Sequence, residues 1–347
     1  MVPLTAALTL RLAYREPFDG GALLAFLAAR AIPGVEEVTG NRYARTIRSV
    51  GGPGLVELIL PAPASGRGHV VLRVRLPRPD GRFPGPESRI IGVDGRLPWP
   101  DAADPVVSRC RQLLDLDTDA EAIAAALAAD GVLAPLVQAR PGLRVPGAYD
   151  GFELAVRAVL GQQVSVAAAS TLAGRLAARF GTRLTARPGT RLTARPGTRL
   201  TARFGTQLTA GPGTRLAEPP GRPSLVFPAP ADLAGADLSG LGLTGARQAT
   251  LRALATAVAS GDLALGHGAD PQEAAARLSE LPGIGPWTVA YIRMRALADR
   301  DAFPGTDLGL RRALADLGCQ ASRADRWRPW RAYAAVHLWT WHAAGRR

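Results

Sequence analysis

The sequence predicts an α+β protein in which an N-terminal antiparallel sheet domain precedes an all-helical domain. Apolar and polar residues alternate near the N-terminus, whereas helical spacing dominates from residue 104 onward. Between these regions, residues 77–100 are rich in Pro, Gly and Arg, which is typical of a loop or linker. We therefore place the first domain over residues 1–100 and the second over residues 101–347.

Three strands and one helix are expected in the first domain. From Leu8 to Tyr14, large apolar or aromatic residues occupy every second position, which is the period of a strand with one buried face. The runs 55–60 and 69–76 alternate in the same way, and residues 21–31 have helical spacing. We expect the helix to cover one face of an antiparallel sheet.

The second domain is expected to contain helices only. Asp150, Thr244 and Asp270 are residue types that cap helix N-termini, and Asp270 is followed by a proline at the first helical position. The expected helices cover residues 104–115, 118–129, 150–161, 164–179, 244–259, 271–280, 287–298, 307–317 and 329–343.

Residues 181–220 form a degenerating octapeptide repeat that begins GTRLTARP. Gly or Pro recurs every few residues and no strand or helical period survives, so we expect a flexible, low-complexity insertion. Its arginines either stay in solvent as part of a linker or contact phosphates, and the sequence leaves both readings open.

The charge of the chain favours a polyanionic partner. Forty-two basic residues face 29 acidic ones, giving a net charge of +13, and all 42 are arginine. The repeat contributes +6 of this charge through seven arginines and one glutamate, which leaves +7 elsewhere. Nucleic acid is therefore the first partner to consider.

The composition also excludes several classes of protein. No run approaches the roughly 18 to 20 apolar residues that a membrane span needs, so we expect a cytoplasmic protein with no membrane partner. Cys110 and Cys319 are the only cysteines, too few for a zinc ribbon, a four-thiolate cluster or a disulfide framework. No metal site is expected.

Residues 281–288, LPGIGPWT, lie between two expected helices and form the motif with the most chemical content. We expect Gly283 and Gly285, on either side of Ile284, to allow backbone angles closed to other residues. The N–H groups of such a turn and of the next helix, as far as Thr288, can hold a phosphate oxygen. These features predict a helix-hairpin-helix motif near residues 271–298.

A carboxylate and several aromatic residues follow this hairpin. Asp307, in DAFPGTDLGLRR, stands where a helix should begin, so it is either an ordinary helix cap or a catalytic group. Trp287 and Tyr291 are four residues apart and share a helix face, and Trp339 lies in the tryptophan-rich C-terminal segment. These rings either form a core or stack on an extruded base.

Several segments resemble the helix-hairpin-helix DNA glycosylase superfamily, in particular the bacterial 3-methyladenine DNA glycosylase II (AlkA-like) enzymes. RPGLRVPGAYDGFELAVRAVLGQQVSVAAA, LPGIGPWTVAYIRMRAL, DAFPGTDLGLRR and RPWRAYAAVHLW occur in the order that the family has them. ALLAFLAARA and RYARTI resemble its N-terminal domain. The resemblance covers most of the chain outside residues 77–100 and the repeat.

The resemblance implies roles for individual residues. Asp307 matches the catalytic aspartate, and the base pocket would be formed by Trp287, Tyr291, Trp339 and Phe26. The residues expected to bind DNA are those of the hairpin and of a loop that fills the gap left by the extruded nucleotide, namely Gly283, Ile284, Gly285, Thr288, Gly161, Gln163 and Ser165. The well-known enzyme of this family has leucine as the inserted residue where Gln163 stands here, and tyrosine where Leu308 stands.

The implied function is that of a monofunctional DNA glycosylase that excises alkylated purines of the 3-methyladenine type in base excision repair. It would act as a monomer on double-stranded DNA, without a cofactor apart from a monovalent cation that hairpin carbonyls could hold. Lyase activity in this superfamily uses a lysine, and this chain contains none, with Trp287 at the matching position.

Two alternatives stay open at this point. One is a non-catalytic helix-hairpin-helix module that binds DNA through the hairpin and the arginines. The other is a related glycosylase for deaminated or oxidised bases, which would keep Asp307 and differ in the shape of the pocket.

Overall fold

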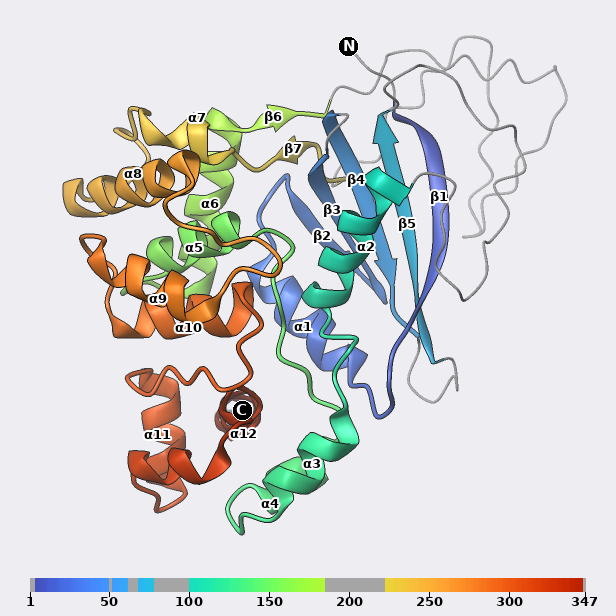
Figure 1. The fold of residues 1–347 in the computed structure, drawn as a ribbon, viewed down its shortest axis with the longest axis vertical. Helices are drawn as coiled ribbons and strands as arrows, with labels where there is room; N and C mark the ends of the chain where they lie inside the picture. Colours follow the sequence, from blue (N-terminus) through green and yellow to red (C-terminus); the bar gives the residue numbers. More distant parts are fainter. Residues whose placement is uncertain (1–3, 50–51, 62–67, 78–99, 185–221, 346–347) are drawn as a thin grey trace, which may run out of the picture.

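The computed structural model describes residues 4–49, 52–61, 68–77, 100–184 and 222–345. An antiparallel five-stranded sheet stands on one side and a helical domain on the other (Figure 1). The predicted α+β class is confirmed. The strands are β1 (Leu4–Ala13), β2 (Glu36–Thr39), β3 (Arg42–Ser49), β4 (Gly52–Ile59) and β5 (His69–Pro77), in the order β1-β5-β4-β3-β2.

The alternating runs form β1, β4 and β5. Strand β5 lies between the other two, and its Leu72 pairs with Leu10 of β1 on one side and with Leu58 of β4 on the other. Strands β2 and β3 were not predicted as strands. In β3, Arg45 and Thr46 are buried beside apolar neighbours, because their polar groups bond to the helical domain and to the segment after the repeat. This inward placement of polar residues hides the period-2 pattern.

Helix α1 (Gly20–Arg30) and helix α2 (Pro100–Leu113) pack on the sheet. Val106, Cys110 and Leu113 of α2 share one buried cluster with Leu23 and Leu27 of α1 and with the sheet. Helix α2 therefore belongs to the sheet by packing, although it follows the boundary that we place at residue 100. Cys110 is a free, buried thiol in this cluster.

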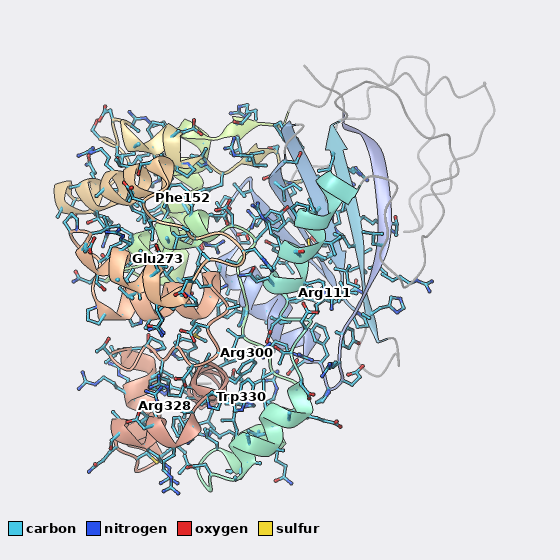
Figure 2. All side chains as sticks on the ribbon, in the orientation of Figure 1. Arg111, Phe152, Glu273, Arg300, Arg328 and Trp330 are labelled. Carbon is cyan, nitrogen blue, oxygen red and sulfur yellow. The ribbon has the colours of Figure 1, made fainter. Side chains whose placement is uncertain are left out.

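All the expected helices of the second domain are present, and Asp150, Thr244 and Asp270 cap theirs as predicted. Their side chains fill a core that includes Phe152, labelled in Figure 2. Short elements without a clear period were missed: α4 (Ala134–Ala139), α7 (Pro230–Ala234) and the 3-10 helix η1 (Ala321–Trp327). The expected helices are α3 (Ala120–Ala128), α5 (Gly151–Leu160), α6 (Val166–Phe180), α8 (Gly245–Ser260), α9 (Pro271–Glu280), α10 (Pro286–Ala296), α11 (Leu308–Asp316), α12 (Arg331–Ala344) and the α2 already described.

The repeat is anchored at its first residues. Strand β6 (Thr182–Arg183) pairs with β7 (Leu225–Val226), so the two ends of the insertion lie side by side. The second domain is therefore mostly helical, and the expectation that it contains helices only is wrong at this strand pair. Most of the repeat, from residue 185 to 220, and residues 78–99 lie outside the described residues, as do the predictions made for them.

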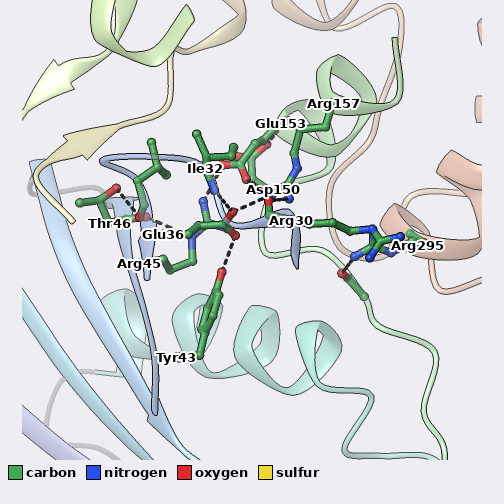
Figure 3. Close-up of polar contacts among 12 residues, drawn as sticks. Arg30, Ile32, Glu36, Tyr43, Arg45, Thr46, Asp150, Glu153, Arg157 and Arg295 are labelled. Carbon is green, nitrogen blue, oxygen red and sulfur yellow. Dashed lines mark hydrogen bonds and ion pairs between the residues drawn. The ribbon is translucent and has the colours of Figure 1, made fainter. Parts of the chain in front are cut away.

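A buried cluster of four charges joins the sheet domain to the helical domain (Figure 3). Arg45 of β3 pairs with Glu153 of α5 at 2.5 Å, and Arg157 of α5 pairs with Glu36 of β2 at 2.9 Å. Burial opposes ionisation of Glu36, but Arg157, Arg45 and the Tyr43 hydroxyl outweigh it and hold the pKa of this carboxyl below its usual value. The cluster therefore fixes α5 against the sheet.

Loss of one member of this cluster should cost more than loss of a matched pair. We expect Arg45→Met to lower the free energy of unfolding by about 3 to 5 kcal/mol, because it leaves buried carboxylate charge with too little compensation. Arg45→Met combined with Glu153→Met removes one charge of each sign and should cost less than Arg45→Met alone. Urea unfolding of the wild type, Arg45→Met, Glu153→Met and the double variant measures this. Costs that simply add in the double variant would contradict the assignment.

Candidate active site

A cavity of about 1400 Å³ lies where the two domains meet. Its walls come from α1, from the loop between α5 and α6, and from α10, α11 and α12. It brings together predicted site residues that are far apart in the sequence: Asp307, Trp287, Tyr291, Trp339, Phe26, Gly161, Gln163 and Ser165. The predicted hairpin residues 283–285 and Thr288 do not line it.

Asp307 holds three helices together at the cavity wall. The indole nitrogen of Trp287 donates to Oδ2 at 2.9 Å, and the indole nitrogen of Trp339 donates to Oδ1 at 2.9 Å. The backbone N–H of Leu310 donates to Oδ1 at 2.9 Å, so Asp307 is also the N-cap of α11. The two readings left open from the sequence, cap and site carboxylate, therefore apply to the same side chain.

Gly309 lies beside the Asp307 carboxylate and leaves room for it, and sequence reasoning did not identify this glycine. A Cβ at this position would lie 3.1 Å from Oδ1 of Asp307 and 3.4 Å from Cδ1 of Trp339. The contact with Oδ1 is tighter than ordinary packing, so a Cβ here would require the carboxylate to shift by a few tenths of an ångström.

The aromatic residues form a continuous wall beside the carboxylate. The rings of Trp287 and Tyr291 stack, with centroids 5.0 Å apart and planes 12° apart, as their spacing on α10 predicts. The Tyr291 hydroxyl accepts a 2.7 Å hydrogen bond from Arg295, whose guanidinium also lies 4.6 Å from the centre of the Phe26 ring. Trp287, Tyr291, Trp339 and Phe26 are half-buried, so their rings remain reachable from the cavity.

In the hairpin between α9 and α10, Gly283 has the backbone conformation that we expect and Gly285 does not. Gly283 has φ +79°, and a Cβ there would lie 2.2 Å from Oγ1 of Thr250. Gly285 has φ −92°, an ordinary value, so the prediction that its backbone requires glycine is wrong. A Cβ on Gly285 would meet nothing within 4 Å, so this glycine leaves open space in front of the helix N-terminus.

The other hairpin residues are mostly covered. Ile284 and Thr288 are buried, and the Thr288 hydroxyl contacts the side-chain amide of Gln162 at 3.1 Å. Gln162 also donates to the carbonyl of Gly283 at 2.9 Å, and thus links the loop of residues 161–165 to the hairpin. Ile284 N–H donates to the carbonyl of Leu281. A monovalent cation on the hairpin carbonyls would have to share these oxygens and stays a prediction.

Gln163 projects from a loop with an unusual backbone. Its φ is +58°, in the left-handed region that few residues other than glycine adopt, and its side chain is exposed. Val164 and Val166 beside it are also exposed, which is uncommon for residues of this type. Ser165 caps α6 through a hydrogen bond to the N–H of Ala168. The insertion of Gln163 into DNA stays a prediction.

Arginines also line the cavity, and sequence reasoning did not single them out. Arg30, Arg157 and Arg295 line the cavity near Tyr291. Burial opposes ionisation of Tyr291, but Arg295 and Arg30 outweigh it and hold the pKa of this hydroxyl below its usual value. The only signal in the sequence was the spacing of four residues between Phe26 and Arg30, which puts both on one face of α1.

Within the described ranges, no group of three or more His, Cys, Asp or Glu residues could hold a metal ion. Nor does that part of the chain contain a helix long and apolar enough to span a bilayer.

The comparisons with known proteins show to which family this chain is similar. The family described as "AlkA N-terminal domain" matches residues 9–81 and 85–150. "DNA-3-methyladenine glycosylase 2" from Escherichia coli (strain K12) is 31% identical over 335 residues, which cover 94% of this chain and 95% of that protein. The structure of the "3-methyladenine dna-glycosylase from Archaeoglobus fulgidus" has a TM-score of 0.66 at 18% identity, covering 96% of this chain and 98% of that chain.

The sheet domain, the hairpin and the cavity together define the fold of the helix-hairpin-helix glycosylases. Within this class, the chain belongs to the AlkA family of DNA-3-methyladenine glycosylase 2, which confirms the resemblance noted from the sequence.

One relative is considerably longer than this chain. "Probable bifunctional transcriptional activator/DNA repair enzyme AlkA" from Mycobacterium tuberculosis is 40% identical over 340 residues, which cover 96% of this chain and 56% of that protein. The chain thus spans little more than half the length of that relative.

The two hairpin glycines should respond differently to the same substitution. We expect Gly283→Ala to lower the free energy of unfolding by about 2 to 4 kcal/mol, because alanine is strained at positive φ and would clash with Thr250. Gly285→Ala should change it by less than about 0.5 kcal/mol, because its backbone and surroundings accept a methyl group. Urea unfolding of both variants measures the difference, and equal costs would contradict the hairpin geometry.

Proposed function

We propose that this chain is a monofunctional DNA glycosylase that binds an extruded, alkylated purine and hydrolyses its N-glycosidic bond. The observation that carries the proposal is the carboxylate of Asp307, held by two indole N–H groups in the wall of an aromatic cavity. A base inside a duplex cannot reach such a carboxylate, so the nucleotide must first be flipped out.

The position of Asp307 suits the chemistry of this bond. A carboxylate offers about four lone-pair positions, and the described residues use two on Oδ1 and one on Oδ2. Oδ2 therefore keeps an acceptor site for a water molecule. As the bond between C1′ and the base breaks, the base leaves with the electron pair and positive charge builds on the sugar. Asp307 stabilises this charge and accepts the proton of the water that adds to C1′.

The aromatic wall supports alkylated purines as substrates. Methylation at N3 or N7 gives the purine a positive charge, which makes it a good leaving group that needs little acid assistance. A cationic base also stacks favourably on tryptophan. Trp287, Tyr291 and Trp339 supply such surfaces next to the carboxylate.

The absence of lysine supports hydrolysis without strand cleavage. A glycosylase that also cuts the strand through a Schiff base needs a primary amine, and the chain contains no lysine. Trp287 stands at the matching position of the hairpin and donates to Asp307. The products are then the free base and an abasic site, the first step of base excision repair.

The surface around the cavity supports duplex DNA as the partner. The open space at Gly285 and the start of α10 suit a phosphate oxygen, and the exposed residues 163–166 lie at the cavity mouth, where they can replace the extruded nucleotide. One flipped nucleotide needs only one such cavity, so we propose that the protein acts as a monomer.

The carboxylate is tested by base release from methylated duplex DNA. We expect the wild-type protein to release methylated purines without cutting the strand, and Asp307→Asn to lose at least about a hundredfold in rate, because the amide cannot stabilise the cationic sugar. Binding of both proteins to DNA with an abasic-site analogue is measured alongside.

Asp316→Asn is the matched control, since Asp316 lies on the same helix α11 but is exposed and makes only a 3.6 Å ion pair with His342. It should release bases at the wild-type rate. If the wild type binds DNA and releases no base, the non-catalytic DNA-binding module replaces the glycosylase.

A further inference from the structure

The loop that joins α5 to α6 has a backbone conformation that is unfavourable by itself. Gln163 has φ +58°, and the left-handed region costs free energy for every residue except glycine. Residues 163–167 are all exposed, so packing of their side chains contributes little to offset this cost. The contacts that keep Gln163 in this conformation must therefore come from the residues on either side of it.

Gln162 fixes the loop on the side that precedes Gln163. Its side-chain amide donates to the carbonyl of Gly283 at 2.9 Å and to the hydroxyl of Thr288 at 3.1 Å, which uses both of its N–H groups. Its backbone carbonyl accepts a 2.5 Å hydrogen bond from Arg247 of α8. Gln162 is thus bonded to the hairpin and to α8, two segments that are far from it in the sequence.

Ser165 fixes the loop on the other side. Its hydroxyl accepts from the N–H of Ala168 at 3.2 Å and its carbonyl accepts from the N–H of Ala169 at 3.0 Å, as expected of the N-cap of α6. Only residues 163 and 164 lie between the two fixed points. Loss of the Gln162 bonds would let this short segment relax and would free Gln163 to leave the left-handed region.

We propose that Gln162 is a positioning residue, which holds Gln163 ready for the duplex and links the filling of the gap to the binding of the hairpin. The inference rests on the proposed glycosylase function, in which residues 163–166 replace the extruded nucleotide. In that function the hairpin and the start of α10 hold a phosphate, and both side-chain bonds of Gln162 go to this same segment. The contact with the strand therefore sets the place at which Gln163 enters the stack.

The benefit of this link is order in the loop before DNA is bound. A side chain that fills a gap loses less conformational entropy when its backbone is already fixed, so the extruded state is reached at a lower cost. Gln162 also lines the cavity, but its N–H groups are used at the hairpin. Its effect is therefore exerted through Gln163, and the chemistry at Asp307 stays as it is.

The experiment measures the rate of base release from methylated duplex DNA in single turnovers with excess protein. We expect Gln162→Met, which keeps the size of the side chain without its N–H donors, to lower this rate about tenfold, because the loop loses the order that the two hydrogen bonds supply. The affinity for the same duplex without damage should stay within about twofold of the wild-type value, since no nucleotide is extruded from it.

Gln163→Ala separates a positioning role from a merely structural one. Alone, this variant should lower the rate of base release at least about tenfold. If Gln162 acts through Gln163, adding Gln162→Met to Gln163→Ala should lower the rate by less than a further factor of about two, so that the two losses do not multiply.

Gln248→Met is the matched control. The side-chain amide of Gln248 also donates to a backbone carbonyl, that of Leu243 at 3.1 Å, and this bond stays within the first turn of α8 and the residues before it. The variant loses a hydrogen bond of the same kind and should release bases at the wild-type rate.

The results that would overturn the positioning role are distinct from failure of the glycosylase function. An equal loss from Gln162→Met in the wild-type and Gln163→Ala backgrounds would mean that Gln162 only maintains the fold of the hairpin. A parallel loss of affinity for undamaged duplex would make it part of the phosphate site. An unchanged rate in Gln162→Met or in Gln163→Ala would also overturn the inference. A wild-type protein that releases no base would overturn the glycosylase function and this inference together.

Discussion

Three N–H groups from three different helices meet at the carboxylate of Asp307, and the rest of the site is arranged around this convergence. Trp287 brings α10, Trp339 brings α12, and the N–H of Leu310 belongs to α11, each at 2.9 Å. Neutral donors hold a carboxylate in place and leave its charge intact. A paired arginine would cancel that charge. The negative charge is thereby kept for the cavity. The same indoles that hold the carboxylate present their rings to whatever enters beside it.

The arginines of the cavity and of the domain interface follow a second constraint, because arginine is the only side chain of the protein that is always positively charged. Buried arginine is tolerated where carboxylates or carbonyls accept its donors, as for Arg45 and Arg157 between the domains and for Arg295 against the 146–147 carbonyls. Arg30 has no ion pair within the described residues and instead contacts the ring and the carbonyl of Phe26 and the Tyr291 hydroxyl. The cavity thus has the Asp307 carboxylate and several arginine side chains in one lining.

Much of the fold was predictable from local patterns, and the failures have physical causes. Strands β1, β4 and β5 show clean alternation, whereas β3 buries Arg45 and Thr46 and therefore does not. Asp307, the ring pair Trp287 and Tyr291, and the hairpin were identified from spacing and resemblance. Gly309 and Arg30 were not, because the approach of Trp339 to Gly309 and of Tyr291 to Arg30 brings together residues far apart in the sequence. The ordinary φ of Gly285 could not be predicted from the sequence either, because it depends on the conformation of the turn.

The claim on which the site depends is that Asp307 stabilises positive charge on the sugar. The most direct measurement is the affinity for two duplexes, one with a neutral tetrahydrofuran abasic analogue and one with a pyrrolidine analogue whose ring nitrogen is protonated. We expect the wild-type protein to bind the charged analogue at least about tenfold more tightly, and Asp307→Asn to bind the two alike. Equal binding of both analogues by the wild-type protein would contradict the role of this carboxylate.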